Sequence, residues 1–426
     1  MSHDSSGHTS NTSRASGAAR ATLPAVREAA LPRRRLIVLL GSIVAIGPLS
    51  IDTYLPAFPE MSDALDASAS AVQLTLTACL AGVAVGQLVM GSLSDRLGRR
   101  GPILAGMAAY VAASLLCAVA PDAATLTALR FVQGFCGAAG MVVSQAVVRD
   151  LHAGAAAVRV FSSLMFVIGV APIVAPVLGG QILQLTSWRG IFVALAVIGA
   201  LVGLAVLLGL PETLPRERRD MRGLRQTLRT LRRLLGLRDF MGYALASCLS
   251  FATVFAYVAG SSFVLQDVYG MSPQLFSVVF GAGGIGIVLS SRVNARLAGR
   301  VEPIVILRRA MATKAVAAFV LLGVFLSEGL GAWAVMVPLF AIVCAFAFAL
   351  PNATALALSD HPEVAGAASA LLGVIQFVGG AAVAPLVGVA GTDTAIPMGV
   401  VMSVLGVAGV AVLRILVPPR AAGGAS

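Results

Sequence analysis

The chain has 426 residues, of which 58% are hydrophobic and only 12% are charged, and its mean hydropathy is +0.92. A soluble domain has about 25% charged residues, so this composition excludes an ordinary soluble protein and predicts a surface that faces lipid. The net charge of +11 does not indicate nucleic-acid binding, because the basic residues gather in a few short loops and the N-terminal tail.

The apolar runs are continuous and about 20 residues long, which suits helices that cross about 30 Å of hydrocarbon. Alternating strands of a membrane barrel would give a different pattern. We therefore predict an all-α membrane protein with twelve spans, at residues 36–56, 73–94, 102–120, 125–148, 160–184, 190–210, 240–262, 274–291, 304–326, 332–351, 365–390 and 395–417.

The segment between the sixth and seventh spans divides the chain into two bundles of six helices, at residues 33–210 and 240–418. Residues 1–32, rich in Ser, Thr, Ala and Gly, are predicted to be a disordered tail, and residues 419–426 form a second tail. Because the first apolar run is long and many others follow it, we interpret it as an uncleaved span and not as a signal sequence.

The arginines predict the orientation. Nearly all lie in the N-terminal tail and in alternate loops, at 95–101, 149–159, 211–239 and 292–309, whereas the loops between these contain almost none. Basic loops remain on the cytoplasmic side, so we expect both termini in the cytoplasm and a multi-pass protein of the bacterial inner membrane. Loop 352–364 is discordant, since it has acidic but no basic residues, yet acids contribute little to this rule.

The long segment 211–239 contains leucines on one helical face, Leu224, Leu228, Leu231 and Leu235, with arginines on the others. This pattern predicts an amphipathic helix that lies on anionic lipid between the bundles. The alternative is a solvated linker that only enforces orientation.

A short repeat relates the two halves. Residues 91–100 read GSLSDRLGRR and residues 291–300 read SRVNARLAGR, and each follows the second span of its half. Repeated halves are typical of transporters, in which the substrate site lies between them. The sequence thus favours a transporter with two parallel six-helix bundles.

Several motifs resemble those of a known family. GSLSDRLGRR resembles a signature of the major facilitator superfamily, and RFVQGFCGAAG, from Arg130 to Gly140, looks like its fourth-span motif. APVLGG resembles the fifth-span motif of proton-driven antiporters, with Ala175 in place of a glycine. IDTYLPAFPEM and SWRGIF are similar to the bicyclomycin and chloramphenicol resistance (Bcr/CflA) branch of drug:proton antiporters.

This resemblance implies a proton-coupled efflux antiporter for small amphipathic or hydrophobic compounds, not an enzyme, and a monomer driven by the proton gradient without a cofactor. An alternative is a transporter of a specific metabolite, such as a purine or nucleoside. A non-transporting sensor and a passive channel are less favoured. No Walker-type loop supports ATP drive, and no Cys or His spacing indicates a metal site.

Asp52 lies in PLSIDTYLP at the end of the first apolar run. A carboxylate at bilayer depth costs about 2.5–3.5 kcal/mol, so it should face a cavity or a partner. We interpret Asp52 as a proton-binding group, with Tyr54 beside it. The alternative is that Asp52 is wetted at the outer surface.

Arg130 is the predicted partner of Asp52. Counted from cytoplasmic arginines, the two lie about 26 Å and 28 Å along their helices. Gln133, one turn from Arg130, offers donors and an acceptor. The alternative is that Arg130 extends to the outer interface. The resemblance also associates Asp52 and Arg130 with proton coupling and substrate binding.

Two further groups have predicted mechanical roles. In the 91–100 loop, Gly91 and Gly98 allow a tight turn, and Asp95 is expected to meet Arg96 or a helix N-terminus. The resemblance implies that these residues, with Arg99 and Arg100, form a conformational latch; the alternative is that the arginines only fix topology. In the fifth span, the resemblance implies a hinge made of Pro172, Ala175, Pro176, Gly179 and Gly180, with ordinary close helix packing as the alternative.

Two predictions concern the C-terminal half. Phe251 and Phe255 share a helical face and could line an apolar cavity or simply pack against a neighbouring helix. Lys314, the only lysine, is expected to extend to the cytoplasmic surface.

Overall fold

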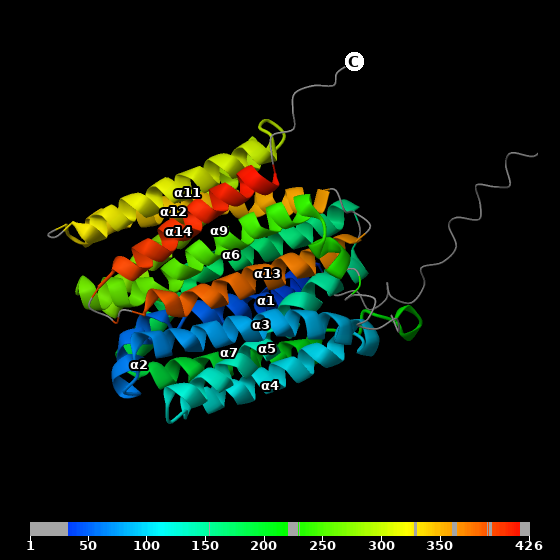
Figure 1. The fold of residues 1–426 in the computed structure, drawn as a ribbon. Coiled ribbons are helices and arrows are strands. Elements are labelled where there is room, and N and C mark those ends of the chain that lie inside the picture. Colours follow the sequence, from blue (N-terminus) through cyan, green and yellow to red (C-terminus); the bar gives the residue numbers. More distant parts are fainter. Residues whose placement is uncertain are drawn as a thin grey trace, which may run out of the picture.

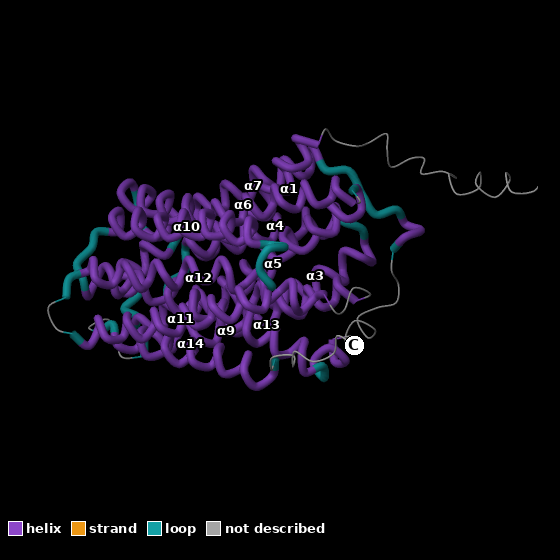
Figure 2. The backbone as a smooth tube through the Cα atoms, turned by 90° about the horizontal axis from the view of Figure 1, so that it is seen from above, coloured by secondary structure: helices purple, strands orange, loops and turns teal. Residues whose placement is uncertain are grey.

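The structure is a computed structural model that describes residues 33–152, 154–219, 229, 231–327, 330–359, 364–389, 391 and 394–417. The predicted tails lie outside these residues. The described backbone is nearly all helical (Figure 2). Twelve of its helices are long and apolar enough to cross a membrane, and each corresponds to one predicted span. The all-α membrane fold is confirmed.

The long helices of the first half are α1 (Arg33–Asp52), α3 (Ala69–Leu97), α4 (Arg100–Ala118), α5 (Ala123–Leu151), α6 (Gly154–Leu185) and α7 (Trp188–Gly209). Those of the second half are α9 (Arg238–Phe263), α10 (Pro273–Leu297), α11 (Pro303–Leu326), α12 (Ala332–Ser359), α13 (Ala365–Val387) and α14 (Ile396–Leu416). Shorter elements are η2 (Leu55–Ala57), α2 (Phe58–Ala64), η3 (Arg216–Arg218) and η4 (Val264–Val268), a π-helical turn that continues α9.

The two halves meet along two helix pairs, α3 with α13 and α6 with α10. Figure 1 shows α11, α12 and α14 on one flank and α3, α4, α5 and α7 on the other, with α1, α6 and α13 between them. We call the end of the molecule with the α3–α4 turn the arginine-rich end, and the end with α2 the arginine-poor end. The interior of α1 therefore lies close to the boundary between the halves.

The first span ends earlier than predicted. Helix α1 stops at Asp52, and η2 and α2 follow within the segment predicted as span and loop. Pro56 explains the break, because proline lacks an N–H and its ring clashes with the carbonyl four residues before it, here that of Asp52. The carboxylate of Asp52 thus lies at a helix end inside the protein.

The described part of the linker packs on protein. Leu231 and Leu234 are buried in a cluster with Phe240 and Leu372 of the second half, whereas Leu235 is exposed. Leu224 and Leu228 lie outside the described residues. At this end of the segment, helices of the second half bury Leu231 and Leu234, and the amphipathic helix as a whole stays a prediction.

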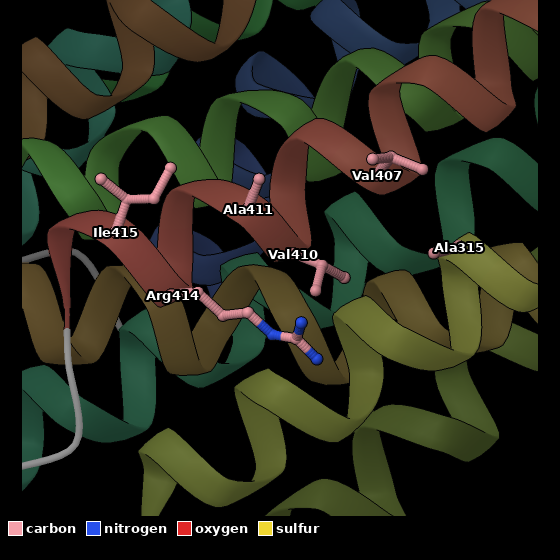
Figure 3. A pocket seen from close by; sticks show the side chains of 6 residues that line it. All are labelled: Ala315, Val407, Val410, Ala411, Arg414 and Ile415. Atoms are coloured by element: carbon pink, nitrogen blue, oxygen red, sulfur yellow. The ribbon is translucent and has the colours of Figure 1, made fainter.

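A groove of about 380 Å³ runs along the outer flank between α11 and α14. Its walls are apolar side chains, and Arg414 reaches over it near the arginine-rich end (Figure 3). The groove lies on the flank away from the first half (Figure 1), so it is separate from the polar centre described next.

Candidate functional site

Arg130 on α5 is completely buried, with 0% of its surface exposed, so the alternative of an outer-interface position is wrong. Its guanidinium donates to the carbonyl oxygen of Ser50 on α1 at 2.9 Å and to Oε1 of Gln133 on its own helix. Gln133 in turn donates through Nε2 to Ser114 Oγ of α4 at 2.7 Å. One hydrogen-bonded centre thus joins three helices of the first half.

Aromatic rings complete the surroundings of Arg130. Its Cζ lies 4.3 Å from the centre of the Tyr54 ring and 5.6 Å from that of Phe192 on α7. A cation over an aromatic face gains about 2 kcal/mol when it is desolvated. The Tyr54 hydroxyl is itself held by Thr75 Oγ1 of α3, at 3.3 Å. Tyr54, which the sequence placed beside Asp52, is therefore a direct neighbour of Arg130.

Sequence reasoning missed three members of this centre, Ser50, Tyr110 and Ser114. The hydroxyls of Ser50 and Tyr110 lie 2.6 Å apart, and all three residues are buried. The only signal in the sequence is that each is a polar residue inside an apolar span. Such residues are common in membrane helices, and their partners are defined only when the helices pack.

Asp52, the last residue of α1, is buried, with 6% of its surface exposed. The wetted alternative therefore does not describe it. The predicted pairing with Arg130 is also wrong in this state, since the ion pairs among the described residues do not include these two. Residues two apart on a helix do not face the same way. Ser50 and Tyr54, four apart, contact Arg130, and Asp52 between them points elsewhere.

Asp52 faces the second half of the protein. Its carboxylate interacts electrostatically with the hydroxyl of Tyr257 on α9. The Tyr257 ring is stacked on Phe280 of α10, with ring centres 5.1 Å apart and planes 9° from parallel. A titratable group of the first half thus lies within electrostatic range of an ordered aromatic pair of the second.

Among the described residues, six side chains connect the halves at the arginine-poor end. Each donates to a backbone oxygen of the opposite half: Ser262 to Leu55 at 2.6 Å, Gln266 to Pro56 at 3.3 Å, Gln73 to Ala259 at 3.1 Å, Thr77 to Ala381 at 2.9 Å, Ser70 to Pro385 at 3.3 Å and Gln274 to Gly180 at 3.5 Å. The break after α1 supplies two of these oxygens. The arginine-poor end is therefore closed.

Helix α6 continues without interruption through both of its predicted hinge prolines, Pro172 and Pro176. Gly179 lies against the backbone carbonyl of Thr53, and a Cβ at Gly180 would meet Ser277 Oγ of α10 at 2.6 Å. Ala175, in place of the family's glycine, is fully buried. The glycines thus let α6 approach α1 and α10 closely, as the packing alternative predicted, and the hinge role remains a prediction.

The predicted latch differs from expectation in its geometry. Helix α3 continues through Gly91 and Arg96, so only Gly98 makes the tight turn, with a φ of +100°. Gly91 instead faces α5, where a Cβ would meet Val142 at 3.3 Å. Arg96 is exposed, and the carboxylate of Asp95 pairs with Arg99 at 2.5 Å.

Arg99 is the centre of the cluster at this turn. Its Nε donates to Asp150 of α5 at 2.8 Å. Burial alone would lower the pKa of Arg99, but hydrogen bonds and charges from Asp150 and Asp95 outweigh it, so that pKa lies above its ordinary value.

A carboxylate does meet a helix N-terminus here, but it belongs to Glu212 and not to Asp95. Glu212 accepts the backbone N–H groups of Arg99 at 2.8 Å and of Arg100 at 3.2 Å, where α4 begins. The Arg100 side chain donates to the carbonyl of Leu207 at 2.7 Å. Glu212 follows the sixth span by only a few residues, and nothing local in the sequence indicates that it returns to α4.

Lys314 is buried, with 1% of its surface exposed, so the prediction that it extends to the cytoplasmic surface is wrong. Its Nζ donates to the carbonyl oxygen of Ser250 at 2.6 Å and to Ser250 Oγ at 2.8 Å. It also lies 5.8 Å from the Phe346 ring centre. Helices α12 and α14 pack around α11, and the side chain extends inward to α9.

Phe251 and Phe255 share a face of α9, as predicted, with ring centres 4.5 Å apart. Phe251 also contacts Phe377 of α13 at 5.3 Å and Phe346 of α12 at 6.3 Å. The two predicted residues thus belong to a four-ring cluster that joins three helices beside Lys314.

Two closely packed six-helix halves, with a buried polar centre inside the first half and a buried carboxylate beside it, are the arrangement expected of a membrane transporter. Residues 38–385 match the Major Facilitator Superfamily, and the chain belongs to this family. It is 44% identical over 379 residues to the uncharacterized MFS-type transporter YdgK of Bacillus subtilis, covering 88% of this chain and 94% of that protein.

A second relative supports the Bcr/CflA branch. The chain is 34% identical over 362 residues to the bicyclomycin resistance protein homolog of Haemophilus influenzae, covering 85% of this chain and 91% of that protein. Among solved structures, a nucleoside transporter, NupG, has a TM-score of 0.72 at 12% identity, covering 89% of this chain and 99% of that chain. At this low identity the structural likeness shows the fold alone.

Proposed function

We propose that this protein exports small amphipathic or hydrophobic compounds across the bacterial inner membrane in exchange for protons, and that it does so as a monomer. The observation that supports this most directly is Asp52, a buried carboxylate at the boundary of the halves that Arg130 does not neutralise. The drug-resistance relative supports the class of substrate.

We take the arginine-rich end as cytoplasmic, which places both termini inside the cell. The closed end is then the outer one. A buried carboxylate without a cation is costly as an anion, so we infer that Asp52 holds its proton in this state. Opening of the inner cavity to water would let Asp52 release that proton to the cytoplasm and bind substrate.

Opening of the protein toward the outside would then complete the exchange. The hydrogen bonds between the halves at the arginine-poor end would break, the substrate would leave, and Asp52 would take up a proton from outside. Alternating access of this kind needs rigid halves that tilt around the site. Arg130 supplies such rigidity, because its bond to Ser50 fixes α1 on α5, and Gln133 beside it bonds to Ser114 of α4.

Transport in liposomes tests the proposal. With a pH gradient imposed, we expect the protein to move labelled chloramphenicol, out of a panel of drugs and nucleosides, and collapse of the gradient with a protonophore should stop it. Asp52→Asn should abolish gradient-driven transport while the protein still folds. Asp63→Asn, an exposed acid on α2, is the matched control. Full gradient-driven transport by Asp52→Asn would refute the proton role.

A further inference from the structure

A cavity of about 380 Å³ lies between α10 and α12, with α9 as its floor. We call it the α10–α12 pocket. Its mouth is formed by Trp333, Val337 and Phe340 of α12, and its inner part by Gly283 of α10 and Tyr257 of α9. Ligand sites commonly have volumes of about 300–1,000 Å³ and mostly apolar walls with few polar groups. The pocket matches that description.

The mouth of the pocket opens toward lipid. Trp333 and Val337 are 71% and 73% exposed, and Phe340 is also exposed. Their spacing of four and three residues places them on one face of α12. In a helix that crosses a bilayer, such an exposed apolar face contacts acyl chains. A compound dissolved in the membrane could therefore enter the pocket without passing through water.

The floor of the pocket is its polar part. The ring of Tyr257 stacks on the ring of Phe280, which fixes its orientation. A Cβ at Gly283 would lie 3.7 Å from the Tyr257 hydroxyl, so the missing side chain leaves space beside that hydroxyl. The same hydroxyl interacts electrostatically with Asp52 of the first half. The inner part of the pocket therefore lies on the side of α9 that is within electrostatic range of the proposed proton site.

We propose that the α10–α12 pocket binds a hydrophobic ring compound with one hydrogen-bonding group, taken from the bilayer and presented to the Asp52 centre. This inference rests on the proposed function, since it describes how a substrate of that class reaches the site. The walls fit apolar rings, and the Tyr257 hydroxyl supplies one hydrogen-bond donor and acceptor. A plain acyl chain would leave that hydroxyl without a partner.

Two glycine variants give a matched comparison. At Gly283 a Cβ makes only ordinary contacts, at 3.7 Å and 3.9 Å, so in Gly283→Leu the longer side chain should occupy the cavity without displacing backbone. At Gly323 on α11 a Cβ would have no neighbour within 4 Å, and this glycine faces outward, so Gly323→Leu adds the same side chain outside the pocket. Tyr257→Phe removes only the hydroxyl.

Fluorescence of Trp333 reports binding directly, without transport. In purified protein we would titrate a bromonaphthol, whose bromine quenches indole, and compare bromonaphthalene, which lacks the hydroxyl. Trp333→Phe identifies the signal, since Trp188 is the only other tryptophan. We expect saturable quenching whose Kd rises at least about tenfold in Gly283→Leu and stays unchanged in Gly323→Leu. Tyr257→Phe should weaken bromonaphthol binding roughly three- to tenfold, as loss of one hydrogen bond predicts, and leave bromonaphthalene unaffected.

Quenching that never saturates, or that is equal in the two leucine variants, would overturn the proposal, because it would reflect partition into detergent or lipid. Equal binding of both probes by the wild type would overturn the role of Tyr257. This readout is independent of the proposed function. Saturable binding in a protein whose Asp52→Asn variant still transports would refute proton coupling alone, whereas gradient-driven transport without saturable quenching would refute the pocket alone.

Discussion

Lys314 donates to the backbone carbonyl of Ser250 at 2.6 Å, as Arg130 donates to that of Ser50 at 2.9 Å. The two serines are two hundred residues apart, the same separation as Arg96 and Arg296 in the repeat. Each lies on the first long helix of its half. The cations, however, do not correspond, because α5 is the fourth long helix of the first half and α11 is the third long helix of the second. The repeat therefore includes the serine that accepts the hydrogen bond but not the cation that donates it.

Replacement of Lys314 by methionine should preserve or raise stability. Among the described residues, no carboxylate forms an ion pair with Lys314. Because burial of an ammonium group without an anionic partner is costly, an apolar side chain of similar length should be tolerated at this position. We expect an unfolding temperature in detergent at or above that of the wild type. Lys314→Ala, which leaves a cavity, should lose about 2 kcal/mol or more. A methionine variant less stable than the alanine variant would contradict this account.

Replacement of Arg130 by lysine should impair both stability and transport. One ammonium cannot reach Ser50 and Gln133 together and also cover the Tyr54 ring as a planar guanidinium does. The buried acceptor that is left unpaired should cost about 1–3 kcal/mol. Liposome transport should fall at least tenfold, roughly the effect of that energy. The exposed Arg296→Lys is the control, and equal transport by both variants would show that the geometry of Arg130 is unimportant.

Gly179→Ala should destabilise the contact of α6 with α1. The added Cβ would collide with the backbone carbonyl of Thr53, which cannot rotate away, and overpacking of this kind costs about 1–3 kcal/mol. Alanine otherwise favours a helix by about 1 kcal/mol over glycine, so Gly323→Ala, with open space around it, should be neutral or stabilising. Thermal unfolding of the two alanine variants tests this prediction. Equal unfolding temperatures would exclude the close approach of α6 to α1 at Gly179.

Glu212→Ala should weaken the turn between α3 and α4. It removes the acceptor of two amides at the start of α4, and loss of such a cap costs about 0.5–2 kcal/mol. Glu212→Gln keeps one acceptor oxygen and should lose less. Because a negative charge at a helix N-terminus is screened by salt, the wild-type advantage over the glutamine variant should shrink at high ionic strength. If the wild type were more stable than the glutamine variant by the same amount at every salt concentration, the negative charge of Glu212 would not be the cause.

Much of the fold could be predicted from the sequence because its causes are local. A run of apolar residues long enough to cross a bilayer gives a helix wherever it occurs, and this pattern identified all twelve spans. The first span was overextended past Asp52 because the apolar run continues through Pro56, and only the packing around η2 makes the break stable.

Only some members of the candidate site, and none of its contacts between helices, could be predicted from the sequence. Counting residues along the helices placed Arg130 at the same height as Asp52 at the end of α1, and it placed Gln133 one turn from Arg130. Side-chain direction across the bundle was not available from the sequence.

By itself, the sequence determined that this is a twelve-helix membrane protein of two related halves, with an acid and a cation at similar heights near one end. Tertiary structure decided that both are buried, that Arg130 binds Ser50 and does not pair with Asp52, and that Lys314 lies inside the second half. The reason is physical. Burial in a bilayer follows from composition along one helix, whereas the partner of a buried polar group depends on the rotation of each helix about its axis, which is fixed only when all the helices pack.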